Sequence, residues 1–427
     1  MFLLILAALT LTPLAAAGPA SAANSAAAPT AAGNSRYIVE LSPSAGDPAA
    51  AAADLARQYG LSVGHIYRNA LFGFSASIPA EALKAVAADR RVAQITADAE
   101  IRPNLPRPEP MPQSRAFPDT GQTTPPGISR IQAPENAIFQ SNPVDADVAV
   151  IDTGVWAGHP DLNVVGGVNC VAGEENIDYF GHGTHVAGII GALDNTIGVV
   201  GVAPGVRLWS VKVLNKDGFG TMSDIVCGID WVTANASVIE VANMSLGGNL
   251  PMKAEDGKCG RTIGDAEHEA ICASVRAGVT YVVAAGNNCG NADYFAPGGY
   301  KEVITVAAMT DTDGQPGAYG PAGVTRNCGV YDKDGVLVND RQPLPNPDDA
   351  IAAYTNTGKS IDIWAPGTNV LSTFPMDTHV SNRPYAVLSG TSMATPHVTG
   401  VVALMLRDNP ALTPEQVRSQ LRAQAER

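Results

Sequence analysis

The chain carries little charge, and most of it is negative. Only 16% of its 427 residues are charged, and 27 basic against 41 acidic residues give a formal net charge of −14. No basic stripe is present, which argues against nucleic acid as a partner. Beyond the N-terminus no uninterrupted apolar run approaches the roughly 18 residues of a membrane-spanning helix. We therefore expect no membrane anchor.

The chain also lacks the cysteine spacing of a zinc site. Its six cysteines include no Cys-x-x-Cys pair, and this even count favours disulfides and an oxidising compartment. Cys259 and Cys272 bracket a short loop, so we predict that they are bridged. The remaining pairings stay open.

Residues 1–23 have the pattern of a signal peptide. Phe2 to Leu14 is almost wholly apolar and Ala20-Ser21-Ala22 supplies the small residues of a cleavage site, although no Lys or Arg precedes the apolar stretch. The apolar run is short for a spanning helix. We therefore expect a secreted, extracellular protein.

Residues 36–103 predict a small α+β unit. Its periodicity indicates, in order, a strand at 37–41, a helix at 47–59, a strand at 71–78, a helix at 79–90 and an extended stretch at 92–101. This order is typical of a split βαβ, ferredoxin-like sandwich.

A proline-rich stretch separates this unit from the rest. Eight prolines fall within the 24 residues from Pro103 to Pro126, which predicts an exposed linker at 104–126 that can be cleaved. Beyond it, residues 127–427 alternate apolar strands with helical stretches. This pattern indicates an α/β domain with a mainly parallel central sheet.

Three motifs in the larger domain could carry chemistry. Asp152 ends an apolar strand, His182 lies between glycines where a helix begins, and Ser392 precedes a long apolar helix. Pro396 fits the first turn of that helix, which places Ser392 at or just before its N-terminus. Taken singly, these residues are as well explained as a turn, a packed side chain and a helix cap.

Neither of the other histidines near these motifs suggests a metal. His182 and His185 lie three apart, but no Glu completes a His-Glu-x-x-His motif, so we reject zinc and expect no catalytic metal. We expect His185 and His397 to be packed helix residues.

The order Asp152, His182, Ser392 is more specific than any one motif. The α/β-hydrolases run Ser, Asp, His and need Gly-x-Ser-x-Gly, which is missing around Ser392. From about Tyr37 to its C-terminus the chain resembles the subtilase family of serine endopeptidases, with an inhibitor-type propeptide at 36–103. An esterase on another scaffold and an inactive binding module are the alternatives.

The resemblance implies a subtilisin-like three-layer α/β domain that hydrolyses peptide bonds through an acyl-enzyme. We expect a monomer that acts on proteins and peptides and is first inhibited by its own propeptide. Asp152, His182 and Ser392 would be catalytic, and Asn287 would form the oxyanion hole with the backbone N–H of Ser392. The residues implied to bind substrate are Gly218, Phe219, Gly220, Ser245, Leu246, Gly247, Gly248, Ala284, Ala285, Gly286 and Phe295.

Two details of the pocket follow from the same resemblance. The family carries a cis-proline at the position of Pro297, at the pocket floor. Phe295 would narrow the pocket.

The resemblance also implies a structural calcium site. The loop 193–199 is expected to interrupt the helix that begins at His182, leaving carbonyl groups that a hard cation can collect. The implied ligands are Asp161, Leu193, Asn195, Ile197 and Val199. A further ligand, which the family takes from its mature N-terminus, has no evident counterpart here.

Residues 315–352 depart from the family pattern. Subtilases run directly from the strand at 306–308 to the segment at 353–358, whereas about forty residues intervene here. We expect a surface flap, for which a bridge from Cys328 to Cys289 is one possibility.

Overall fold

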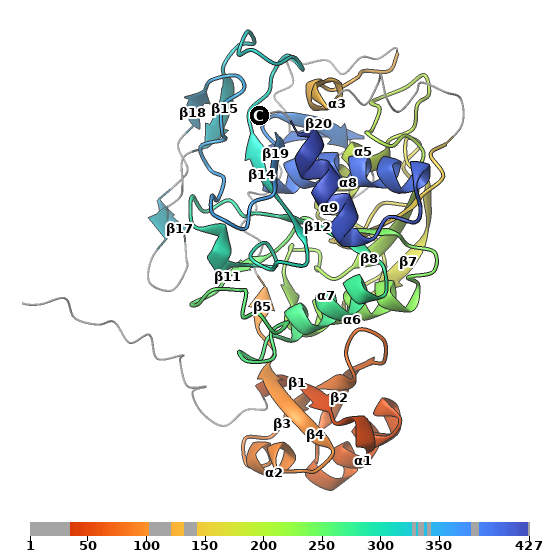
Figure 1. Cartoon of the computed structure of the whole chain (residues 1–427). Helices are drawn as coiled ribbons and strands as arrows, with labels where there is room; N and C mark the ends of the chain where they lie inside the picture. Colours follow the sequence, from red (N-terminus) through yellow and green to blue (C-terminus); the bar gives the residue numbers. More distant parts are fainter. Residues whose placement is uncertain are drawn as a thin grey trace, which may run out of the picture.

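The structure, a computed structural model, describes residues 35–101, 121–131, 143–326, 330–331, 337–339, 343–376 and 384–425. The predicted signal peptide, most of the predicted linker and Cys328 lie outside these ranges. Figure 1 shows a small N-terminal unit, coloured red to orange, below a larger domain. Within the described residues no helix is both long and apolar enough to span a membrane.

The N-terminal unit is a four-stranded antiparallel sheet with the strand order β2-β3-β1-β4 and two helices. Its elements are β1 (Ser35–Leu41), α1 (Pro48–Tyr59), β2 (Ser62–Tyr67), β3 (Gly73–Ile78), α2 (Leu83–Ala87) and β4 (Val92–Ala97), with a 3₁₀ turn at Pro43–Ala45. Asp47 caps α1 by accepting the Ala50 N–H at 3.0 Å, and Gly60 ends it with φ 69°. This is the strand order of a split βαβ sandwich.

The sequence interpretation of this unit was wrong in two places. It missed β2, whose first half is exposed and contains Gly64, so that no clean apolar alternation marks it as a strand. It also made α2 too long, because residues 79–82 form only a turn before Leu83.

The larger domain is built on a seven-stranded sheet in which every pairing is parallel. The strand order is β19-β14-β12-β10-β6-β8-β7. The strands are β6 (Asp147–Asp152), β7 (Val164–Asn169), β8 (Arg207–Lys212), β10 (Val241–Met244), β12 (Thr280–Ala284), β14 (Ile304–Met309) and β19 (Ile363–Pro366). The predicted three-layer α/β architecture is confirmed.

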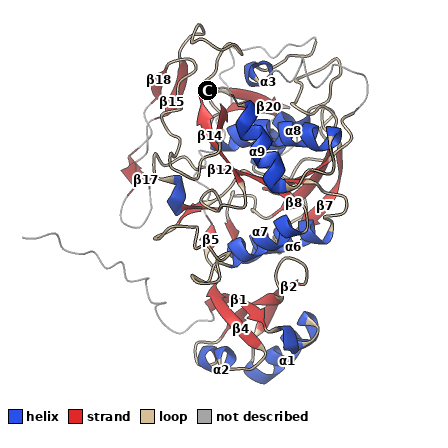
Figure 2. Cartoon of the chain, in the orientation of Figure 1, coloured by secondary structure: helices blue, strands red, loops and turns tan. Residues whose placement is uncertain are grey.

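Helices cover both faces of this sheet (Figure 2). The helices are α3 (Pro126–Arg130), α5 (His182–Gly191), α6 (Met222–Ala234), α7 (Ala266–Arg276), α8 (Thr391–Asp408) and α9 (Pro414–Gln424). Val148 and Val150 of β6 share a buried cluster with α5 and α8, whereas Ala149 and Ile151 share another with α6 and α7. Since successive side chains of a strand point to opposite faces, β6 is buried on both sides.

Short two-stranded sheets lie outside the seven-stranded sheet. They are β5 (Glu100–Ile101) with β9 (Gly220–Thr221), β11 (Gly248–Asn249) with β13 (Phe295–Ala296), β15 (Gly323–Arg326) with β18 (Pro343–Asn346), β16 (Val330–Tyr331) with β17 (Leu337–Asn339), and β20 (Val370–Thr373) with β21 (Tyr385–Leu388). A 3₁₀ turn lies at Ala292–Tyr294. The predicted insertion therefore contains two small hairpins.

Two helix predictions need correction. Helix α5 ends at Gly191 and does not resume after the loop 193–199, because this loop leads through turns into β8. Pro396 lies in the second turn of α8, not the first, since the helix begins at Thr391. Without an N–H, Pro396 cannot bond the Ser392 carbonyl, which accepts the Ser245 hydroxyl at 2.9 Å instead.

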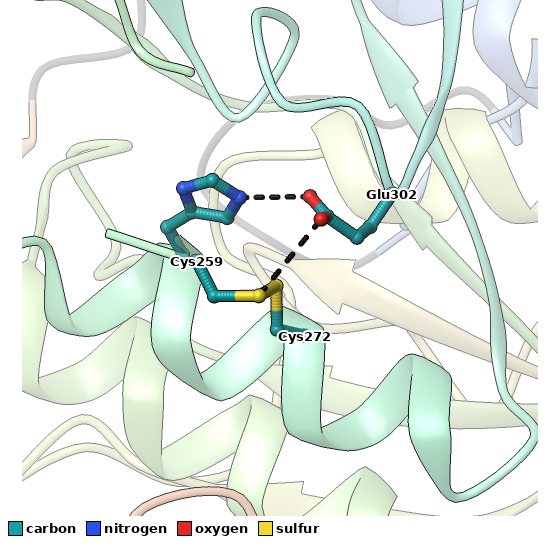
Figure 3. Close-up of side chains that lie close together, drawn as sticks. Cys259, Cys272 and Glu302 are labelled. Carbon is teal, nitrogen blue, oxygen red and sulfur yellow. Dashed lines mark hydrogen bonds and ion pairs between the residues drawn. A yellow bond between two sulfur atoms is a disulfide. The ribbon is translucent and has the colours of Figure 1, made fainter. Parts of the chain in front are cut away.

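Two disulfides are described. Cys259–Cys272, which was predicted, joins a loop to α7, and Figure 3 shows it beside Glu302. Cys170–Cys227, which sequence reasoning left open, joins the end of β7 to α6. Cys289 is not a free thiol either.

The two bridges should differ in their contribution to stability. They close loops with sequence separations of 13 and 57 residues, worth about 3 and about 4 kcal/mol in the chain-entropy model. We expect Cys170→Ala/Cys227→Ala to lower the free energy of unfolding more than Cys259→Ala/Cys272→Ala. Urea unfolding in a Ser392→Ala background, which prevents self-digestion, measures both. The reverse order would contradict loop closure as the main effect.

Candidate functional site

The residues of the predicted triad come from three elements that meet at the carboxyl edge of the sheet. Asp152 is the last residue of β6, His182 is the first of α5, and Ser392 lies in the first turn of α8. Strand β6 lies inside the parallel sheet, between β10 and β8, and α5 packs against α8. Ligand sites of open parallel sheets lie at this edge.

Asp152 and His182 are joined by a buried hydrogen bond. The Nδ1 of His182 lies 2.7 Å from Oδ1 of Asp152, and both side chains are almost completely buried. The Nε2 of His182 is buried and has no hydrogen-bond partner among the described residues. The hydroxyl of Ser392 donates to the Ser245 carbonyl at 3.1 Å. This geometry fixes the imidazole from one side and leaves its second nitrogen for another group.

Asn287 is fixed against the start of α8. Its Oδ1 accepts the Thr391 N–H at 2.8 Å and the Thr391 hydroxyl at 3.0 Å. Since an amide carries its oxygen and nitrogen on opposite sides, Nδ2 is directed away from Thr391. The N–H of Ser392 lies at the second position of α8, where the regular helical bonding pattern provides no partner.

A buried carboxylate that the sequence interpretation missed positions this site. Asp178 is fully buried, and its Oδ1 accepts the Thr153 hydroxyl and the Gly181 N–H. Its Oδ2 accepts both the N–H and the hydroxyl of Thr184. Burial raises the pKa of Asp178. Asp178 thus holds together the end of the strand after Asp152 and the start of the helix at His182. An Asp shortly before a helix is the sequence signal that could have indicated Asp178.

A buried lysine supports the other side of the same strand end. The Nζ of Lys212 donates to the carbonyls of Thr153 and Leu214, and it lies 3.3 Å from Glu174. Its burial lowers the pKa of the ammonium group. Lys212 is the last residue of β8, and no sequence signal distinguishes it from a surface lysine.

The other two predicted helix histidines are packed, as expected. His185 is fully buried with Nε2 3.1 Å from the Ala386 carbonyl, and His397 is buried with Nδ1 2.8 Å from the Met393 carbonyl. Burial lowers the pKa of His185 to about 3 and that of His397 to about 4. Both are therefore neutral at pH 7, and each lies within hydrogen-bond distance of a backbone carbonyl.

A family model of the subtilases matches residues 145–427. The chain belongs to the subtilase family. Subtilisin DY of Bacillus licheniformis is 37% identical over 308 residues, which cover 71% of this chain and 92% of that protein. Subtilisin BL of Lederbergia lenta is 38% identical over 302 residues, which cover 70% and 91%. A crystal structure of a cold adapted subtilisin-like serine proteinase matches at 30% identity with a TM-score of 0.49, over 67% of this chain and 85% of the other.

Membership in this family makes the protein a serine endopeptidase, a hydrolase whose substrates are proteins. In this subtilase the residues expected to bind substrate fall in two places. Gly218, Phe219 and Gly220 lie in a turn and β9, beside the N-terminal unit. The others surround the end of β12 and the pair β11–β13, close to Ser392.

Phe295 fills the space between the two walls expected to form the primary pocket. A Cβ added at Gly247 would lie 2.5 Å from the Phe295 ring, and one at Gly286 would lie 2.9 Å from it. Gly286 also has φ +97°, which few other residues adopt. The peptide bond between Ala296 and Pro297, just after Phe295, is cis, as the resemblance implied.

The loop 193–199 places hydrogen-bond donors against the buried carboxylate of Asp161. Oδ2 of Asp161 accepts the Val199 N–H at 3.1 Å, and Oδ1 accepts Nδ2 of Asn195 at 2.7 Å. Burial raises the pKa of Asp161 to about 6. Among the described residues, no Lys or Arg pairs with this carboxylate.

Gln122, which the sequence interpretation missed, is bonded to the loop 193–199. Its Nε2 donates to the Leu193 carbonyl at 2.6 Å and lies 3.3 Å from the Val199 carbonyl. Thr123 forms a bridge with Val199 beside it. The last residues of the predicted linker are therefore bonded to the larger domain. The sequence could not show this, because a polar residue in a proline-rich stretch does not indicate a contact with another segment.

Cys259, Cys272, His268 and Glu302 form another group of metal-ligating residue types. The two sulfur atoms are joined in the disulfide, and Nε2 of His268 lies 2.8 Å from Glu302. Disulfide sulfurs are not the thiolates that zinc requires. The earlier preference for a disulfide over zinc is confirmed here.

Removing the Phe295 ring should widen the primary pocket. We expect Phe295→Gly to raise kcat/KM for a peptide with Phe before the cleaved bond, relative to one with Ala there, by roughly tenfold or more. Phe295→Tyr, which keeps the ring, is the matched control and should retain the wild-type ratio. Matched chromogenic peptides measure the ratio. An unchanged ratio in Phe295→Gly would show that the ring does not limit the pocket.

Proposed function

We propose that this subtilase is a secreted endopeptidase that is made as an inactive precursor and processes itself. Ser392 is the nucleophile in this proposal, since a serine hydroxyl needs a neighbouring base to react at neutral pH. The base is His182, whose Nε2 has no hydrogen-bond partner among the residues that the structure describes. The single observation that carries the assignment is the buried bond between Asp152 and His182.

In the proposed reaction, His182 takes the Ser392 proton through Nε2 as the hydroxyl attacks the peptide carbonyl. Asp152 keeps the proton of His182 on Nδ1 and stabilises the imidazolium. His182 then gives its proton to the leaving amine, and a water molecule hydrolyses the acyl-enzyme by the same route. The developing oxyanion accepts hydrogen bonds from Nδ2 of Asn287 and the N–H of Ser392.

The contacts of the N-terminal unit support the precursor. Strand β5 pairs with β9 in antiparallel fashion, with Ile101 opposite Gly220, so it occupies the edge proposed to bind substrate. An extended substrate adds to such an edge as a strand.

A second set of contacts anchors the unit to α6. The carboxylate of Asp98 accepts the N–H and hydroxyl of Ser223 at the helix N-terminus. Asp230 accepts the backbone N–H groups of Arg68, Asn69 and Ala70. Apolar residues of the unit share one buried cluster with α6 and α7. The unit thus has the contacts that an intramolecular inhibitor requires.

Secretion is proposed from the two described disulfides and the leader-like residues 1–23. Calcium is proposed at Asp161 and the carbonyls of Leu193, Ile197 and Val199, with the side chain of Asn195. Gln122 adds a sixth group, because rotating either amide by half a turn presents its oxygen to the site. A cation there would neutralise Asp161, and all these ligands are oxygens, which calcium prefers.

Self-processing can be tested with the nucleophile removed. Wild type should yield a mature form that begins after Ile101 and no later than Gln122, because Gln122 is bonded to the loop 193–199. Ser392→Ala, expressed alone, should accumulate as the uncleaved precursor. N-terminal sequencing and intact mass measure this. Normal processing of Ser392→Ala without any other protease would refute the serine assignment.

The oxyanion role of Asn287 has its own signature. We expect Asn287→Ala to lower kcat by about 10²–10³, with little change in KM, because the bond forms mainly in the transition state; the figure comes from a subtilisin. Asn288→Ala, one residue further, is the control and should stay near wild type. A change confined to KM would assign Asn287 to ground-state binding instead.

Calcium should stabilise the folded protein. Binding only to the folded state contributes about 2.7 kcal/mol at a free concentration one hundred times Kd. A chelator should therefore lower Tm, and calcium but not magnesium should restore it. Asp161→Ala and Gln122→Ala should each lose most of this response. Identical melting with and without calcium, together with no bound metal by elemental analysis, would exclude the site.

A further inference from the structure

The insertion after β14 returns to the sheet at a cluster of acidic residues. Asp311 and Asp313 follow β14 where the insertion begins, and Asp348 and Asp349 follow β18 where it ends. The base is closed by a bridge between Met309 and Ile351 and by the bond from the Thr310 N–H to the Ala350 carbonyl. Both ends of the insertion are therefore held at one place.

Three of these carboxylates converge. Asp311, Asp313 and Asp348 each place an oxygen within 4.8 Å of the other two. The side chain of Asp311 is fully buried, Asp348 is nearly so, and Asp313 is exposed. Like charges at this separation repel, and burial weakens the screening by water.

One carboxylate oxygen in the cluster lacks a hydrogen bond. Oδ1 of Asp311 accepts the Gly314 N–H, but its buried Oδ2 accepts no hydrogen bond from the described residues. The Nε of Arg130 lies 3.7 Å from it, while this arginine donates to Asp349 at 2.9 Å. Orphaned buried oxygens are rare in folded proteins. Arg130 thus divides its charge between an ion pair with Asp311 and a hydrogen bond to Asp349, and neither contact gives Oδ2 of Asp311 a hydrogen bond.

Backbone N–H groups of the surrounding loop hold the carboxylates in place. Asp348 accepts the Thr312 N–H through Oδ1 and the Gly320 N–H through Oδ2. Gly314 follows the two aspartates with φ +76° and donates its N–H to Asp311 at 2.7 Å, which closes a tight turn over 311–314. The carboxylates are therefore held together by the backbone, at the cost of their mutual repulsion.

We propose that the base of this insertion is a calcium site with Asp311, Asp313 and Asp348 as ligands, separate from the loop 193–199. All donors are oxygens, which excludes the thiolate and imidazole sites that zinc prefers. Calcium accepts six to eight oxygens in irregular geometry, whereas magnesium demands a near-octahedral set. The cation fastens both ends of the insertion to β14.

Asp313→Asn tests the site with little risk to folding. Asp313 is exposed, and the amide oxygen of Asn can still accept the Gln315 N–H. The full chain carrying Ser392→Ala is loaded with calcium and desalted, and bound calcium per chain is measured by elemental analysis. We expect Asp313→Asn to bind one calcium fewer than its parent. Asp145→Asn, which removes an exposed carboxylate paired with Arg207, should bind the same number.

Two further measurements separate this site from the one proposed at Asp161. The number of calcium ions lost in Asp313→Asn should add to the number lost in Asp161→Ala when both changes are combined in one variant. Calcium should also slow hydrogen exchange at the Gly314 and Gly320 amides in the parent and in Asp161→Ala, but not in Asp313→Asn. An equal calcium count in the parent and Asp313→Asn, or calcium-independent exchange at both amides, would leave Arg130 as the only counter-ion and overturn the proposal.

Discussion

The hydrogen bond between Asp152 and His182 is the interaction on which the proposed chemistry depends. It is buried at the carboxyl edge of a fully parallel sheet, and the rest of the site is arranged around it. Asp178 ties the strand end to the helix start, and Lys212 holds the same strand end from the other side. Two buried ionisable groups are costly unless their bonds are satisfied. Here their bonds fix the two elements that carry Asp152 and His182.

Helix α6 links the N-terminal unit to the edge proposed to bind substrate. Helix α6 packs on the central sheet with one face and receives the N-terminal unit at its N-terminus and at Asp230. The short strand just before this helix pairs with β5. Because β9 leads directly into α6, one helix sets the position of both the unit and the edge proposed to bind substrate.

The sequence predicted the parts of this protein that depend on local patterns. The parallel sheet follows from apolar strands alternating with helices, and the order of three short motifs led to the proposed triad, whose residues the structure brings to one edge of that sheet. Asp178, Lys212 and Gln122 were missed because their roles arise from tertiary contacts: each bonds to backbone groups of another segment. Strand β2 was missed because it is a half-exposed edge strand, and the Cys170–Cys227 pair could not be chosen from six cysteines without knowing which elements lie side by side.

The central claim is that Ser392 is made nucleophilic by His182, and covalent labelling tests it most directly. A fluorophosphonate, which reacts with activated serines, should add one group to the mature enzyme, and peptide mass spectrometry should place it on Ser392. His182→Ala should fold but label far more slowly, because its serine keeps its proton. Labelling of another residue, or equal labelling of Ser392 in His182→Ala and wild type, would contradict the account.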